Sequence, residues 1–168
     1  MNTLEELLID ELRDLYNAEH QQLANMPALA RKTSSETLRS AMESHLQETD
    51  RQVRRLETIS TELGVPLTGK RCLAMEGLVD EAQQVLDENG YSAVIDEAII
   101  SALQRIEHYE MAAYGNARAL AEQLHRARLA LFLQESLDEE KAADLKLTDI
   151  SEHEILVMAS AEGTASGR

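Results

Sequence analysis

Seven ionisable side chains lie on helical stripes that otherwise carry apolar residues. They come from four segments that are far apart in the chain, and they are Glu19, His45 with Glu48, Glu107 with Glu110, and Glu140 with Asp144. Burying these groups in one core would cost roughly several kcal/mol each if nothing offset their charge. Carboxylates can bridge two cations and an imidazole adds a nitrogen ligand. These residue types therefore indicate a site for a pair of metal ions.

The spacing within the segments supports this interpretation. In three of the four segments the two residues are three or four positions apart, so each pair shares one face of a helix. Bundle-core sites for two iron or manganese ions take one Glu from each of two helices and a Glu-x-x-His pair from each of the other two. Here the order at residue 45 is His-x-x-Glu, and Asp144 stands where a second His would be. This oxygen-rich set favours Fe or Mn over Zn or Cu.

Long helices must position these residues. The chain has 3% aromatic residues, no Trp and two Pro, a composition that favours an all-α fold. The patterns predict a helix over about 4–31, a second that begins at a Thr33–Glu36 capping box and ends at Gly64, a third capped by Ser92, and a fourth over about 129–150. A shorter amphipathic helix follows the loop at 64–71 and is closed by Asn89 and Gly90.

Chain arithmetic tests whether the acidic residues can meet. In an antiparallel hairpin, residues equidistant from the turn lie at the same height. The midpoint of Glu19 and Glu48 falls at 33–34, and that of Glu110 and Glu140 falls at 125, each in a predicted turn. Each set thus lies about 15 residues, or roughly 22 Å, from its own turn. Two hairpins packed side by side would bring all four to one level.

The long connection between the hairpins decides the topology. About 30 residues allow the second hairpin to cross over, as in a ferritin-like four-helix bundle with an additional short helix in the crossover. The alternative is an up-down bundle in which five helices are equal members. A single domain over residues 1–158 is expected, and the small polar residues at 159–168 predict a disordered tail.

Charge and composition exclude several functions. A net charge of −15 opposes binding to nucleic acid or to an anionic membrane surface. No apolar run approaches the roughly 20 residues that a membrane span needs, and no export segment is evident, so a cytoplasmic location is expected. Cys72 is the one cysteine, which predicts a buried thiol in a reducing compartment.

A second interpretation has no metal. Some of the 31 acidic residues will fall in phase with the core by chance, and the chain could then be a helical interaction module whose core carboxylates are protonated or hydrogen-bonded. Asp144 and Glu107 are the members most easily assigned to other roles. Tyr16 and Tyr114 lie one helical turn from Glu19 and Glu110, respectively, and could place phenols near the site.

Several runs of sequence resemble the YciF-like family of bacterial stress proteins, which is ferritin-like and related to rubrerythrin. The resemblance covers about residues 4–150. The runs are Cys72-Leu-Ala-Met-Glu-Gly-Leu78, Ile106-Glu-His-Tyr-Glu-Met-Ala-Ala-Tyr-Gly115, Leu137-Asp-Glu-Glu-Lys-Ala-Ala-Asp144 and His45-Leu-Gln-Glu-Thr49.

The resemblance implies a helical bundle, usually dimeric, with a di-metal centre and stress-associated expression. It implies metal ligation at Glu19, His45, Glu48, Glu107, Glu110, Glu140 and Asp144. Unlike rubrerythrins, the chain has no Cys-x-x-Cys segment, so redox turnover would need an external reductant. We therefore expect a cytoplasmic homodimer with two Fe or Mn ions per chain that reacts with peroxide or dioxygen during stress, and alternatively a metal buffer or interaction module without turnover.

Overall fold

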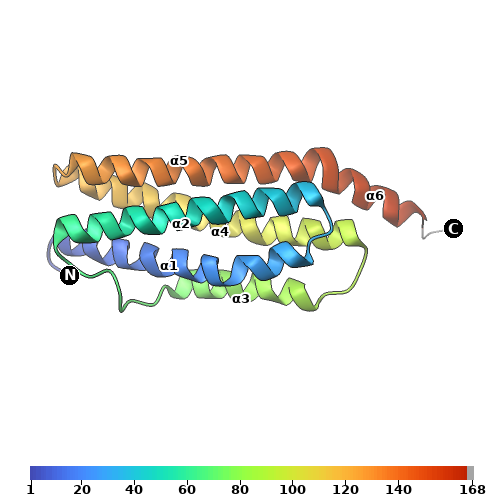
Figure 1. The fold of residues 1–168 in the computed structure, drawn as a ribbon, viewed down its shortest axis with the longest axis horizontal. Helices are drawn as coiled ribbons and strands as arrows, with labels where there is room; N and C mark the ends of the chain where they lie inside the picture. The colour runs from blue at the N-terminus through green and yellow to red at the C-terminus, as the bar shows by residue number, and fades with distance from the viewer. Residues whose placement is uncertain (166–168) are drawn as a thin grey trace.

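Helices dominate the computed structural model, which describes residues 1–165 (Figure 1). The helices are α1 (Leu4–Lys32), α2 (Glu36–Leu63), α3 (Leu73–Asp87), α4 (Ser92–Gln123), α5 (Ala127–Ile150), the π-helical turn η1 (Ser151–Ile155) and α6 (Leu156–Ala165). The described part of the chain has no β-strand. The predicted all-α fold is confirmed.

The four long helices form the bundle, and α3 packs on its outside. α1 contacts α2 and α4, while α5 contacts α4 and α2, so the two hairpins lie side by side. α3 runs along α1 and contacts α1 and α4, as Figure 1 shows. The shorter helix therefore belongs to the crossover between the hairpins, as predicted. The alternative with five equal helices is wrong.

The helix ends agree with the sequence in part. Thr3 caps α1, because its Oγ1 accepts a hydrogen bond from the backbone N–H of Glu6 over 3.1 Å. The predicted capping box at Thr33 is wrong, because Ser35 is the N-cap of α2 and accepts from the N–H of Leu38. Ser92 is the first residue of α4, and the cap position is Tyr91.

Asp96 explains why Thr33 does not cap α2. This buried carboxylate of α4 accepts hydrogen bonds from the Thr33 and Ser34 hydroxyls over 2.6 Å each. It also accepts from the backbone N–H groups of Ser34 and Ser35 over 2.9 and 2.8 Å. The Thr33 hydroxyl is thus engaged by a residue 63 positions away. Asp96 fastens the α1–α2 turn to the first turns of α4.

The bundle interior contains two apolar clusters. One joins the end of α1 and start of α2 to the start of α4 and end of α5, and includes Met26, Leu38, Ile99, Leu103 and Leu147. The other lies at the opposite end and includes Leu8, Leu56, Tyr114, Leu129 and Leu133. In each long helix, buried polar residues occupy the stretch between the two clusters.

We call these residues the polar layer. The layer comprises the acidic, imidazole and amide side chains of this stretch, which are Glu19 and Gln22 of α1, His45 and Gln52 of α2, Glu107 and Glu110 of α4, and Glu140 of α5. Thr49 of α2 is also buried here, but its hydroxyl donates to the His45 carbonyl over 3.1 Å, and it is not counted in the layer. The layer lies in the middle of the bundle because each member is far from its own inter-helix turn, as the chain arithmetic predicted.

The chain stays helical beyond the end predicted for α5. The π-helical turn η1 leads directly into α6, which ends at Ala165. The tail predicted for residues 159–168 is therefore helical as far as residue 165, and residues 166–168 lie outside the described part. The run Leu-Val-Met-Ala at the start of α6 favours helix because of its Leu, Met and Ala. No helix among residues 1–165 combines the length and apolar character needed to cross a membrane.

Candidate metal centre

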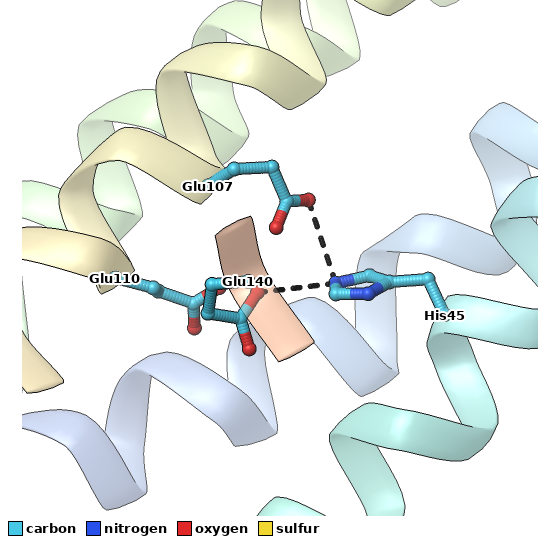
Figure 2. Close-up of side chains that lie close together, drawn as sticks. All are labelled: His45, Glu107, Glu110 and Glu140. Carbon is cyan, nitrogen blue, oxygen red and sulfur yellow. Dashed lines mark ion pairs between the residues drawn. The ribbon is translucent and has the colours of Figure 1, made fainter. Parts of the chain in front are cut away.

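Four side chains from three helices meet in the polar layer. His45 of α2, Glu107 and Glu110 of α4, and Glu140 of α5 are all buried, and each offers one ligand atom within 4.8 Å of those of the others. Figure 2 shows His45 pointing toward Glu107 and Glu140. Its Nε2 lies 3.4 Å from Glu107 Oε1 and 3.7 Å from Glu140 Oε2. Such a set of oxygen and nitrogen atoms matches the donors that Fe and Mn prefer.

Glu19 joins this group from α1. Its side chain is fully buried, and the Tyr114 hydroxyl donates a hydrogen bond to Glu19 Oε1. Tyr114 is itself fully buried in the neighbouring apolar cluster. The Tyr16 hydroxyl instead donates to Glu57 at the surface over 3.5 Å. Of the two phenols considered from the sequence, Tyr114 therefore contacts the polar layer.

The remaining two predicted members lie at its edge or outside it. Glu48 is half-buried, and its Oε2 is 3.4 Å from Nδ1 of His45, the ring nitrogen that faces away from Glu107. Asp144 contacts the opposite side of α4, where its Oδ1 is 3.2 Å from Gln104 Nε2 and 3.3 Å from His108 Nε2. A step of four residues turns a helix by about 40°. That rotation takes Asp144 away from Glu140.

Gln22 and Gln52 are buried members that the acidic pattern did not reveal. Gln22 Nε2 donates to Glu110 Oε2, and Gln52 Nε2 donates to Glu140 Oε1. Both residues have almost no exposed surface. Their sequence signal was their position, since each is in phase with the apolar stripe of its helix. Because an amide is uncharged, a pattern of ionisable residues does not include it, although it orients a carboxylate.

The polar layer concentrates the unsatisfied polar atoms of the molecule. Among residues 1–161, whose side chains the structure describes, eight buried side-chain nitrogen or oxygen atoms lack a hydrogen-bond partner. Seven of them belong to the seven residues of the layer, and they are Glu19 Oε2, Gln22 Oε1, His45 Nε2, Gln52 Oε1, Glu107 Oε2, Glu110 Oε1 and Glu140 Oε2. Folded proteins pair the large majority of such atoms, and each unpaired one costs about 1–3 kcal/mol. A shared partner among His45, Glu107, Glu110 and Glu140, whose ligand atoms lie within 4.8 Å of one another, would satisfy several of them.

The electrostatics of the layer are those of crowded carboxylates. Burial raises the pKa of Glu19, Glu107 and Glu110 well above the usual 4.5. Repulsion from neighbouring carboxylates raises the pKa of each further, with Glu140 acting on all three. In the absence of a cation, these side chains therefore hold protons. A divalent cation would favour their ionised forms and displace the protons.

The pKa of His45 is also raised, but by attraction to neighbouring carboxylates and not by burial. Burial by itself would lower its pKa, but the hydrogen bond to Glu48 and the charge of Glu140 outweigh burial, and the pKa is raised above 6.5. The same contact with His45 lowers the pKa of Glu48. Glu48 thus orients the imidazole through Nδ1 and leaves Nε2 facing the layer, an arrangement typical of metal-ligating histidines.

The arrangement fits a metal centre. Three carboxylates and one imidazole converge from α2, α4 and α5, and the charge of Glu19 from α1 acts on Glu107 and Glu110. Two amides and a phenol donate to the carboxylates. Their unpaired atoms are mostly oxygens, which hard divalent cations prefer.

Known proteins are similar to this chain over most of its length. YciF of Escherichia coli (strain K12) is 43% identical over 152 residues, which are 90% of this chain and 92% of YciF. The crystal structure of the E. coli stress protein YciF matches with a TM-score of 0.86, covering 90% of this chain and 96% of that one. YcfI from Rhodopseudomonas palustris matches with a TM-score of 0.85 at 38% identity, covering 88% of this chain and 94% of that one.

The family assignment rests on nearly the whole chain. The profile described as "Domain of unknown function (DUF892)" matches residues 3–160, a span that contains the bundle and the entire polar layer. The resemblance to the YciF-like stress proteins drawn from the sequence is confirmed. The chain belongs to the DUF892 family, together with YciF.

Proposed function

We propose that this protein binds two Fe or Mn ions in the polar layer and uses them to react with peroxide or dioxygen during stress. The observation that carries the proposal is the buried cluster of His45, Glu107, Glu110 and Glu140, whose ligand atoms lie within 4.8 Å of one another and each of which has a side-chain atom without a hydrogen-bond partner. A cation bound among these residues would supply a partner to the carboxylate and imidazole atoms that lack one. The description of the relative YciF as a stress protein supports the cellular setting.

The residues that would hold the ions are those with donor atoms in the polar layer. Glu19, Glu107, Glu110 and Glu140 would supply carboxylate oxygens, and His45 would supply Nε2. Glu48 would act beside His45, while Asp144 is engaged with His108 and Gln104 and is not needed. When bound, such ions supply Lewis-acid and one-electron chemistry to an oxygen-containing substrate.

The chain's own residues would prepare the site. Gln22 and Gln52 donate to Glu110 and Glu140 and fix the orientation of those carboxylates. Tyr114 holds a phenolic proton at Glu19 Oε1, since burial raises its pKa well above the usual value. The apolar clusters on both sides of the layer exclude bulk water.

Electrons and partners are part of the same proposal. Cys72 is the one cysteine of the chain, so the protein has no dithiol of its own, and an external reductant would complete a redox cycle. We propose a cytoplasmic homodimer as the working form, in line with the resemblance noted in the sequence.

The test is the metal content of protein purified without chelator and then offered Fe²⁺ or Mn²⁺ anaerobically. We expect about two ions per chain in the wild type and a clear loss in Glu140→Gln, which keeps the size of the side chain. Asp144→Asn is the matched control on the same helix and should load normally. Fewer than about 0.1 ions per chain in the wild type would refute the proposal.

A second measurement separates turnover from storage of metal. Loaded protein with an added reductant should accelerate the loss of peroxide, and Glu140→Gln should not. Normal loading without acceleration would establish a metal buffer instead of an enzyme.

A further inference from the structure

A cavity of about 90 Å³ opens between α2 and α5 and reaches the polar layer. Its mouth is formed by the exposed residues Ser44, Ala142 and Lys146. Its deep end is formed by His45 and Glu107, which have 8% and 1% of their side-chain surface exposed. The cavity therefore connects the surface with the candidate metal centre from one side of the bundle.

The walls between mouth and deep end are mostly apolar. Met26, Met42, Leu103 and Leu147 line this part, and all four are buried. A water molecule needs roughly 10–15 Å³ of such space, and a dry cavity of about 150 Å³ binds benzene. The volume here thus suits a molecule of roughly three to five non-hydrogen atoms. A bare ion or a single water would leave apolar wall without contacts.

The deep end carries the polar complement. His45 Nε2 and Glu107 Oε2 are both buried and have no hydrogen-bond partner. In the metal-free protein, a hydroxyl or hydroperoxyl group can donate to the carboxylate oxygen and also accept from a ring N–H. In the loaded protein His45 and Glu107 would hold an ion, and the same oxygen end would face that ion. An anion would meet the carboxylates of the layer, and the apolar walls would desolvate any charged molecule. A neutral molecule with one polar end and a short apolar body meets both constraints.

We propose that this cavity binds a small neutral organic molecule that ends in a hydroxyl or hydroperoxyl group, with that end at His45 and Glu107. This inference rests on the proposed function, since it assigns the substrate class of the same centre. Among the peroxides of the proposed function, it selects short alkyl hydroperoxides. Their alkyl group would contact Met26 and Met42, and their oxygen end would reach the polar layer.

The test uses tert-butanol, an unreactive molecule of this size and shape, and the methyl signals of ¹³C-labelled methionine in NMR. The Met26 and Met42 signals should shift saturably with a Kd of about 1–50 mM, as expected for so few atoms. Met75 and Met111 do not line the cavity and should not shift. Shifts of all methionines that grow linearly with concentration would overturn the inference.

Ala142→Leu places a larger side chain at the mouth, on an exposed position where the fold should tolerate it. We expect it to weaken tert-butanol binding at least tenfold, whereas the exposed Ala119→Leu on α4 should not. Wild-type affinity in Ala142→Leu would overturn the inference. Metal content is measured on the same samples: metal binding without alcohol binding refutes the cavity assignment alone, and alcohol binding without metal binding refutes the proposed function alone.

Discussion

The raised pKa values of the buried carboxyl groups predict that the metal-free protein loses stability as the pH rises. In metal-free protein, the folded-state pKa of Glu19, Glu107 and Glu110 lies well above 4.5, the value for an ordinary Glu. Above pH 4.5 the unfolded chain loses these protons, while the folded chain keeps them. The stabilisation is thus fully present below pH 4.5 and is lost as the pH rises through the folded-state pKa. His45, raised from 6.5, adds a change of the same sign at higher pH.

The magnitude follows from the number of groups. One group that stays protonated in the folded state alone changes the free energy of unfolding by about 1.4 kcal/mol per pH unit. Three would give an upper limit of about 4 kcal/mol per unit. Because the neighbouring carboxylates titrate one after another, we expect a decrease of about 1–3 kcal/mol per unit between pH 5 and 7.

The assay is urea unfolding followed by circular dichroism at several pH values, with chelator present. A parallel series with 1 mM Mn²⁺ should show the opposite trend, because the metal binds the deprotonated side chains. A micromolar site would add about 4 kcal/mol at this concentration. Chelation should therefore lower the melting temperature most at neutral and higher pH.

Glu107→Gln provides the control within the layer, since it removes one titrating group and should make the metal-free slope shallower. The exposed Glu43→Gln should leave the slope unchanged. A metal-free stability that stays flat or increases between pH 5 and 7 would refute the reasoning, because it would mean that the buried carboxylates are already ionised.

Three further predictions concern single contacts. Gln52→Leu removes the amide that donates to Glu140 and should weaken metal affinity about 10–100-fold in chelator competition; unchanged affinity would exclude an orienting role. Asp96→Ala leaves the Thr33 and Ser34 donors without their carboxylate and should lower the free energy of unfolding by about 3–5 kcal/mol in urea, so a loss below about 1 kcal/mol would contradict its fastening role. Tyr114→Phe removes the donor to Glu19 and should cost the metal-free protein about 1–3 kcal/mol, measured in the same way; an unchanged value would show that this hydrogen bond is dispensable.

The sequence was sufficient for the helices and for the depth of the polar layer. Glu19, His45, Glu110 and Glu140 converge because a helix advances by a constant rise, so distance along the chain converts directly into height in the bundle. The α4–α5 turn lies at residues 124–126, at the predicted midpoint of 125. Such arithmetic needs no knowledge of side-chain contacts.

Contacts between distant segments were beyond the reach of that arithmetic. Thr33 reads as a cap for α2, but Asp96 engages its hydroxyl from another helix. Asp144 shares a helical face with Glu140 in a simple count, yet a step of four residues exceeds one helical turn by about 40°, and Asp144 contacts His108 instead. Gln22 and Gln52 carry no charge, so a search for ionisable groups passes over them. In each case the partner, and not the residue itself, decides the role.

The division of the interior by the polar layer has a consequence for how the molecule opens. Helical bundles usually fray from their ends, where packing is thinnest. Here each end has its own hydrophobic cluster. We therefore expect the polar layer in the middle to be the least stable part of the metal-free protein. Backbone amides near Glu110 and Glu140 should therefore exchange with deuterium sooner than those deep in either half. A cation bound in the polar layer would link the two halves of the bundle. The protein would then unfold as one cooperative unit and not as two partly separate cores.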